Sequence, residues 1–276
     1  MKVQILGSGG PELTANRASS SYLVWFNNKA IILIDTGGGS SFRFAQSGAR
    51  WQDLQALLFS HFHADHSSDF PAFIKASWFS NRTKDLDVFG PYGNDFMPST
   101  HEFFDSLFGI DNGAFKYLSD MYDDKKSNEY KLIPHSVKNN DTLQDLKDEN
   151  NFAIKTLQVQ HGPIPAFAYI IELCGKTLVF SGDTNGTGFE NLRLNKTNLF
   201  IAHNAIPEHA GKVAQSLHMR PSQIGEIAKK IHTDKLILSH RMNRSLGKEQ
   251  ETRREIRKFF SGEMTFANDL DVFIVK

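Results

Sequence analysis

Residues 61–66 read His-Phe-His-Ala-Asp-His and follow directly on the apolar run Leu57-Leu58-Phe59. That run predicts a short buried strand, which places the histidines and the aspartate on the loop at its end. Four potential ligands within six residues are far more specific than a single histidine. Nitrogen and oxygen ligands without sulfur suit Zn²⁺, with Mn²⁺ or Fe as alternatives. The stretch therefore predicts a metal site, and chance clustering of surface histidines is the alternative.

A ligand type just after an apolar run recurs three times further along the chain, at His161, Asp183 and His240. Because the ends of neighbouring strands meet at one edge of a sheet, we expect these side chains to converge with the 61–66 loop. Asp35 ends the run Ile31–Ile34 in the same way. It is either a buried carboxylate that orients a metal-bound histidine or a plain turn residue.

These stretches resemble the metallo-β-lactamase superfamily, and within it the ribonuclease Z-like and arylsulfatase-like hydrolases. The resemblance spans nearly the whole chain and is carried by the HxHxDH run at 61–66, His161, SGDT at 181–184, LSH ending at His240, LGSGGP at 6–11 and Asp35-Thr36-Gly37. It implies an α/β fold, an αββα sandwich of two mixed β-sheets flanked by helices. Residues 1–276 would form a single hydrolase domain.

The resemblance also assigns seven metal ligands: His61, His63 and His161 for one ion, Asp65, His66 and His240 for the other, and Asp183 as the bridge between them. Two Zn²⁺ ions, or Mn²⁺ or Fe, would share a hydroxide that attacks phosphorus, sulfur or a carbonyl carbon. Asp65 and His218 are the expected catalytic residues. His218 would protonate the leaving group or contact phosphate, and a surface or helix-capping histidine is the alternative.

The other histidines give weaker signals. His203 also ends an apolar run, but Asn204 stands where the resemblance leads us to expect Glu, which weakens any acid–base relay there. We expect ordinary structural roles for the remaining four: His101, His135, His209 and His232. The glycine-rich residues 7–10 lack GxGxxG spacing, so we expect a tight turn that lets the backbone approach the metal loop.

Turn residues between apolar runs predict two hairpins, Tyr22–Phe26 with Ala30–Ile34 and Ala166–Leu173 with Thr177–Ser181. Pro221–Ile231 has the spacing of an amphipathic helix. Residues 93–150 are rich in Phe and Tyr and predict a helical insertion. The insertion would cover the site and contact an apolar leaving group, or form a satellite core or dimer surface.

The amino-acid composition limits which binding partners we expect for this protein. Lys and Arg together number 31, as do Asp and Glu, so the formal net charge is zero and the basic balance typical of nucleic-acid-binding proteins is missing. The single Cys174 excludes an internal disulfide. The sequence shows neither a signal peptide nor a run of about 20 apolar residues, so we expect a cytoplasmic protein without a membrane partner.

The preferred function from the sequence is hydrolysis of a small-molecule phosphodiester, sulfate ester or related ester. The alternative is a ribonuclease Z-like tRNA 3′-end endonuclease. That family inserts a long RNA-gripping arm before the bridging aspartate, whereas His161 and Asp183 are only 22 positions apart, so we rank a nucleic-acid partner second. A lactonase and a non-catalytic metal-binding protein are the further alternatives for the function. The chain could also form a homodimer.

Overall fold

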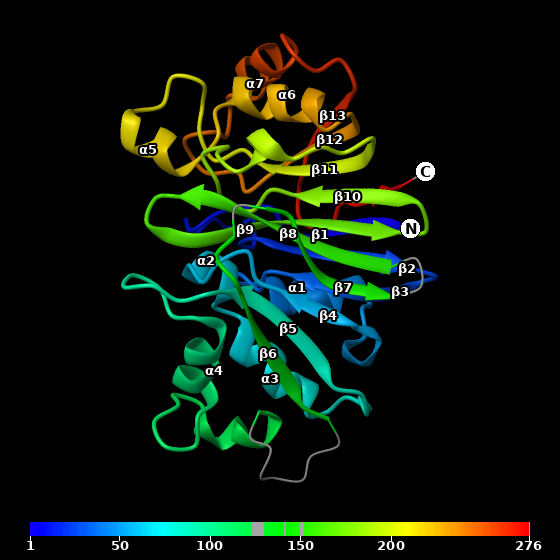
Figure 1. Ribbon diagram of the computed structural model, residues 1–276, viewed down its shortest axis with the longest axis vertical. Coiled ribbons are helices and arrows are strands. Elements are labelled where there is room, and N and C mark those ends of the chain that lie inside the picture. The colour runs from blue at the N-terminus through cyan, green and yellow to red at the C-terminus, as the bar shows by residue number, and fades with distance from the viewer. Residues whose placement is uncertain (123–129, 141, 150–151, 276) are drawn as a thin grey trace. The chain divides into compact units, whose positions relative to one another are not determined.

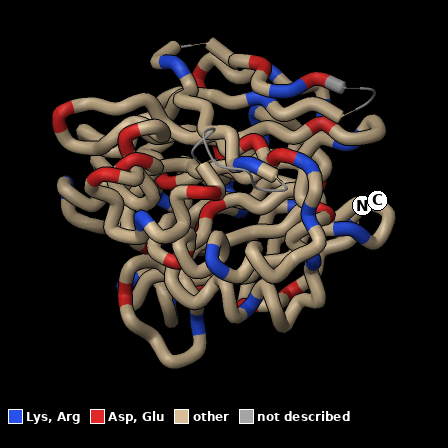
Figure 2. Tube along the Cα trace, turned by 90° about the horizontal axis from the view of Figure 1, so that it is seen from below, with Lys and Arg blue, Asp and Glu red and all other residues tan. Residues whose placement is uncertain are grey.

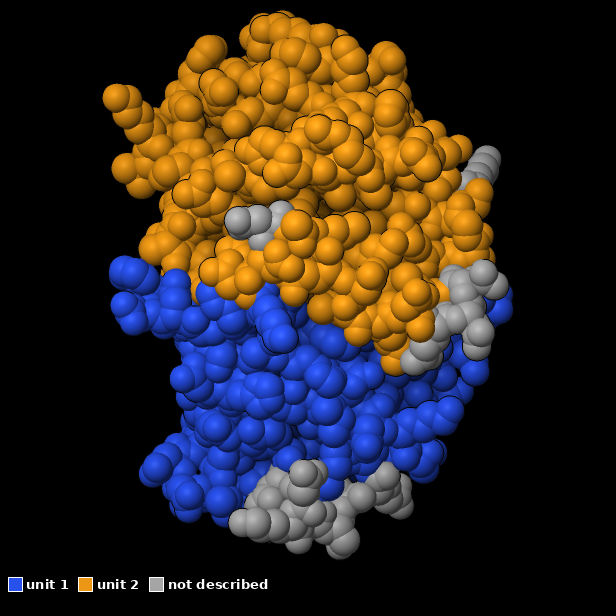
Figure 3. All heavy atoms as spheres, viewed as in Figure 1, with its two compact units in different colours: residues 1–7, 16–138, 269–274 blue, residues 8–15, 139–268, 275–276 orange. Residues whose placement is uncertain are grey.

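The computed structural model describes residues 1–122, 130–140, 142–149 and 152–275. The chain forms two compact units, coloured separately in Figure 3. The first contains residues 1–7, 16–138 and 269–274, and the second contains residues 8–15, 139–268 and 275–276. Each unit contains one seven-stranded sheet and its own helices (Figure 1).

The sheet of the first unit has the order β14 (Val272–Ile274), β1 (Lys2–Gly7), β2 (Ser21–Phe26), β3 (Lys29–Ile34), β4 (Ala56–Leu58), β5 (Leu86–Pro91) and β6 (Leu132–Val137). Its helices are α1 (Ser40–Ser47), α2 (Ala64–Ser67), α3 (Phe70–Ser77) and α4 (Thr100–Phe108), with 3₁₀ turns at Trp51–Asp53 and Lys116–Met121. Aromatic side chains, among them Phe59, Phe70 and Phe104, fill the core between sheet and helices.

The sheet of the second unit has the order β13 (Glu263–Phe266), β12 (Thr233–Ser239), β11 (Thr197–His203), β10 (Lys176–Phe180), β9 (Ile164–Leu173), β8 (Phe152–His161) and β7 (Gln144–Glu149). Its helices are α5 (Lys212–Leu217), α6 (Pro221–Lys230) and α7 (Glu249–Ile256), with a 3₁₀ turn at Phe189–Asn191. Helix α6 begins with proline and buries Ile224, Ile227 and Ala228 in the core of this unit, as its spacing predicts.

The two sheets share one layout. In the first, the strands from β14 to β3 pair antiparallel and those from β3 to β6 pair parallel. In the second, the strands from β7 to β10 pair antiparallel and those from β10 to β13 pair parallel. The central strands β3 and β10 are followed by Asp35 and Asp183, so both candidate carboxylates stand where the pairing changes direction.

The predicted fold class is confirmed, because the structure has two mixed sheets of seven strands flanked by helices. Both predicted hairpins are present: Tyr22 pairs with Ile34, and Ile170 pairs with Val179. The prediction of a single domain stays a prediction.

The helical insertion predicted at 93–150 needs correction, because its described part is helical only at α4 and at Lys116–Met121. The range also contains strands β6 and β7, and they are the outer strands of their sheets. An outer strand pairs on one side only and needs no continuous apolar run. β7 reads Gln-Asp-Leu-Lys-Asp-Glu, which therefore gave no strand signal. Residues 123–129, 141 and 150 of this range lie outside the described residues.

The aromatic residues of that range mostly belong to the core of the first unit. Phe104 and Phe108 are fully buried there, and Phe103, Phe115 and Tyr122 pack against the same cluster. Phe96 and Tyr117 are exposed. The core of the first unit therefore contains most of these rings.

Both Lys and Arg residues and Asp and Glu residues are scattered over the trace of the described residues (Figure 2). Among the described residues, no helix is both long and apolar enough to cross a membrane.

Candidate metal centre

The first ligand cluster lies where β4 ends and α2 begins. His61 is fully buried, and its Nε2 lies 3.0 Å from Nδ1 of His63. His66 is also fully buried, and its Nε2 lies 3.6 Å from a carboxylate oxygen of Asp65. Gly37 permits this tight arrangement, because a Cβ there would lie 2.1 Å from the carbonyl oxygen of Asp65. The four residues of the 61–66 motif therefore form two adjacent pairs of donor atoms.

Asp35 accepts hydrogen bonds from His66 of this cluster and from the adjacent Ser60. Its side chain is 1% exposed and accepts three hydrogen bonds: from the Ser60 backbone N–H at 2.7 Å, from the Ser60 hydroxyl at 2.8 Å and from His66 Nδ1 at 2.7 Å. A carboxylate accepts at both oxygens, so it fixes the His66 ring with Nε2 pointing away from Asp35. The structure thus favours the role of an orienting carboxylate over that of a plain turn residue.

We expect Asp35→Asn to weaken divalent-metal binding by about 10–100-fold. If the asparagine oxygen takes the Ser60 N–H, its NH₂ group faces the Ser60 hydroxyl and His66 Nδ1 and cannot accept from the imidazole N–H, so the His66 ring loses its anchor. Chelator-competition titration measures the effect. Asp87→Asn is the matched control, because Asp87 accepts a 2.8 Å bond from His135 in the same unit but outside the cluster. Equal metal affinity in Asp35→Asn and wild type would show that Asp35 is a plain turn residue.

The second ligand cluster surrounds Asp183, which follows β10 and is 3% exposed. Its carboxylate oxygens have four imidazole nitrogens around them: His203 Nδ1 at 2.7 Å, His240 Nε2 at 3.4 Å, His161 Nε2 at 3.7 Å and His218 Nδ1 at 3.8 Å. One ligand atom from each of His161, Asp183 and His218 lies within 4.8 Å of the other two.

The imidazoles of the second cluster come from the ends of separate elements. His161 is the last residue of β8, and its Nδ1 donates to the carbonyl of Leu217 at 2.8 Å, which directs Nε2 to Asp183. His218 directly follows α5 and is buried. Burial lowers the pKa of His218 to about 3, although the charge of Asp183 opposes that shift. A neutral His218 still has one N–H to donate.

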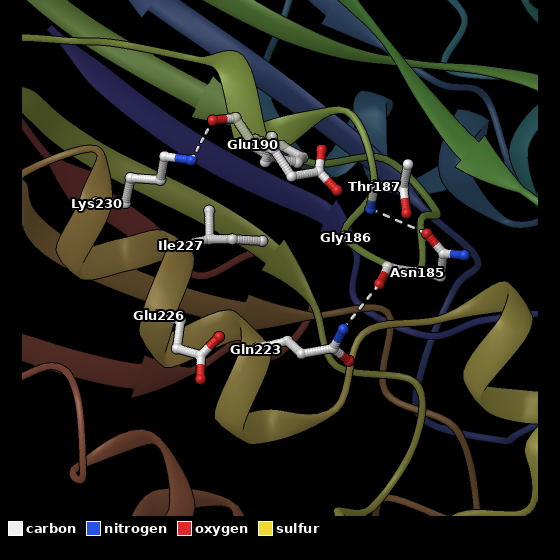
Figure 4. A pocket seen from close by; sticks show the side chains of 9 residues that line it. Asn185, Gly186, Thr187, Glu190, Gln223, Glu226, Ile227 and Lys230 are labelled. Carbon is white, nitrogen blue, oxygen red and sulfur yellow. Dashed lines mark hydrogen bonds between the residues drawn. The ribbon is translucent and has the colours of Figure 1, made fainter.

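Close backbone approaches fix the loops of this cluster. A Cβ on Gly10 would lie 2.8 Å from Cε1 of His240, so this glycine lets the 8–15 segment approach the candidate ligand His240. Beyond Asp183, the carbonyl of Asn185 accepts from Gln223 of α6 at 3.2 Å, and the carbonyl of Glu190 accepts from Lys230 (Figure 4). Helix α6 thus anchors the loop that carries Asp183.

The donor atoms suit a divalent transition metal. Both clusters offer imidazole nitrogens and carboxylate oxygens, and Cys174 lies apart from them in the β9–β10 turn, so sulfur is missing from the set. Two nitrogens bound tetrahedrally at about 2.0–2.1 Å would lie roughly 3.3 Å apart. The 3.0 Å separation in the His61–His63 pair is close to that value.

The predicted residues thus fall into two groups. Four of the seven predicted ligands lie in the first cluster and three in the second, with His218 beside them. The sequence predicted no role in the site for His203, although His203 ends a strand just as His161 does. The four histidines expected to be ordinary lie outside both clusters: His101 and His135 contact Ser136 and Asp87, and His209 and His232 are exposed.

Comparison with known proteins agrees with the fold. The family model described as "Metallo-beta-lactamase superfamily" matches residues 15–222. A ribonuclease Z from Enterococcus faecalis is 22% identical over 99% of this chain and 96% of its own length. Another, from Mycolicibacterium paratuberculosis, is 28% identical over 67% of this chain and 63% of its own length.

Two solved structures extend the comparison, and at their low identities they speak for the fold alone. The metallo-beta-lactamase fold protein YhfI from Bacillus subtilis has a TM-score of 0.76 at 23% identity, over 99% of this chain and 98% of its own. The short form of human tRNase Z (ELAC1) has the same TM-score at 18% identity, with 100% of both chains covered.

The fold and the His/Asp clusters define a metal-dependent hydrolase class whose fold implies divalent-metal binding. The chain belongs to the metallo-β-lactamase superfamily, and the curated relatives to which it is similar are named ribonuclease Z. The arylsulfatase-like part of the prediction has no support among these relatives.

Proposed function

We propose that this protein is a dinuclear metal-dependent phosphodiesterase that cleaves RNA, with the 3′ trailers of tRNA precursors as the first substrate to test. The proposal rests chiefly on the imidazole and carboxylate groups that surround Asp183 and the 61–66 motif. Its RNA part rests on the relatives named ribonuclease Z. The zero net charge favoured a small-molecule ester as the first candidate substrate. Because of these relatives, RNA is now the first candidate and the small ester the second.

In this proposal His61, His63 and His161 hold one divalent ion, Asp65, His66 and His240 hold the other, and Asp183 is shared. Zinc is the first candidate because the donor set contains nitrogen and oxygen only. Bound divalent ions supply Lewis acidity and an activated water for hydrolysis. The protein's own groups do the rest: Asp35 orients His66, Leu217 orients His161, and His218 donates its N–H to the leaving oxygen.

A small phosphodiester is the second candidate, and one observation favours it. Between His161 and Asp183 the structure shows strands β9 and β10 joined by a tight turn. This segment holds no inserted arm of the kind expected to grip RNA. A substrate that needs no such grip would suit this part of the chain.

The deciding experiment compares substrates on metal-reconstituted protein. We expect a tRNA precursor with a 3′ trailer to be cut to a single product, in a manner abolished by chelation and restored by metal. Bis(p-nitrophenyl) phosphate, p-nitrophenyl sulfate and an acyl lactone are assayed in parallel. Cleavage of the diester with no cleavage of RNA at any salt concentration would favour the second candidate. Activity only on sulfate or lactone would contradict both.

A further inference from the structure

The same short hydrogen bond occurs once in each unit. In the first unit His66 Nδ1 donates to Asp35 Oδ2 at 2.7 Å, and in the second His203 Nδ1 donates to Asp183 Oδ1 at 2.7 Å. All four side chains are buried, with at most 3% exposed.

Both bonds involve the aspartate that follows the central strand of its sheet. Asp35 follows β3, and its partner His66 lies in helix α2, which comes after β4, the parallel neighbour of β3. Asp183 follows β10, and its partner His203 ends β11, the parallel neighbour of β10. In each unit the aspartate that follows the strand where pairing changes direction therefore accepts a hydrogen bond from a histidine located at or beyond the end of the neighbouring parallel strand.

The roles of the two partners are exchanged between the units. In the first pair the histidine is the proposed metal ligand, and the aspartate accepts the hydrogen bond that orients it. In the second pair the aspartate is the proposed ligand, and the histidine donates the hydrogen bond to it. We propose that His203 is a positioning residue for Asp183, which fixes the rotation of the carboxylate. This inference rests on the proposed metal-binding role of Asp183.

His203 is itself held rigidly enough to serve this purpose. Its backbone N–H donates to the hydroxyl of Ser181 at 3.1 Å, which ties it to the strand end that leads to Asp183. Its ring stacks on His240, with centroids 4.7 Å apart and planes 22° apart. A ring fixed at the backbone and on one face can fix the carboxylate that it contacts.

The hydrogen bond selects between the two oxygens of Asp183. His203 donates to Oδ1, which also lies 3.4 Å from Nε2 of His240, whereas Oδ2 lies 3.7 Å from His161 Nε2 and 3.8 Å from His218 Nδ1. Without the donor the carboxylate could rotate about its last torsion, which is broad for aspartate. The ligand atoms would then lose their preset arrangement. Restoring that arrangement on metal binding costs free energy, so the metal affinity would fall.

The test uses two substitutions at His203. The amide nitrogen of Asn lies close to the position of histidine Nδ1, so His203→Asn keeps a donor for Asp183. His203→Leu keeps the bulk without the donor. His135→Leu is the matched control, because His135 donates to Asp87 at 2.8 Å in a pair outside both clusters. Zn²⁺ affinity by chelator competition and the absorption spectrum of the Co²⁺-loaded protein are measured for all, with thermal unfolding of each apo protein.

We expect His203→Leu to lower Zn²⁺ affinity by about 10–100-fold and to change the Co²⁺ spectrum, with His203→Asn within about threefold of wild type. His135→Leu should bind as wild type does. Equal affinity in wild type and His203→Leu would overturn the inference. Equal losses in the Asn and Leu variants would also overturn it, because His203 would then be a ligand or a purely structural residue.

These readouts separate this inference from the proposed function. Metal affinity and spectrum are measured without substrate, so they test His203 even if the protein cleaves no RNA. If His203→Leu does not fold, the comparison of His203→Asn with wild type decides: a large loss of affinity overturns the inference. A wild-type protein that binds no divalent metal would contradict both proposals.

Discussion

Asp183→Ala is expected to reduce the metal content from two ions per chain to at most one and to lower hydrolysis by about 10³-fold or more. Four imidazole nitrogens lie around the Asp183 carboxylate, at 2.7 to 3.8 Å. Its removal leaves buried imidazoles facing one another with no negative charge among them. Elemental analysis after metal saturation, together with cleavage rates, measures both effects.

His209→Ala is the control for this prediction, because His209 is exposed in the same unit. It should keep the metal content and the rate of wild type. A wild-type content near one ion per chain, unchanged in Asp183→Ala, would contradict the dinuclear proposal and remove Asp183 from the ligand set.

His218→Ala is expected to lower kcat by about 10²–10⁴-fold on RNA or on any diester with a poor leaving group, with normal metal content. The reason is that an alkoxide leaving group needs a proton or a hydrogen bond, and the N–H of His218 is the proposed source. A p-nitrophenyl diester has a stable leaving group, so the decrease in kcat on that substrate should be much smaller.

The ratio of the two losses separates catalysis from structure. A merely structural His218 would lower stability and affect both substrates alike. Equal losses on both substrates, or loss of metal on mutation, would show that His218 does not act on the leaving group.

The resemblance carried by the motifs at 61–66, 181–184 and 240 implied the fold class, and local patterns in the sequence predicted both hairpins and helix α6. The hairpins and the helix share a local cause. A buried strand is marked by its own apolar run, and an amphipathic helix by its own spacing. The outer strand β7, whose side chains are largely polar, was missed because it has no such run.

Only the tertiary structure pointed to the partners of Asp35 and His203. The sequence left Asp35 open between a turn and an orienting group, and the hydrogen bonds from Ser60 and His66 favour the second. His203 was discounted because of its neighbour Asn204, yet its partner is Asp183, 20 positions away. Such contacts depend on which strands pair side by side. A residue's own neighbours in the chain cannot encode that pairing, because it is set by the packing of the whole sheet.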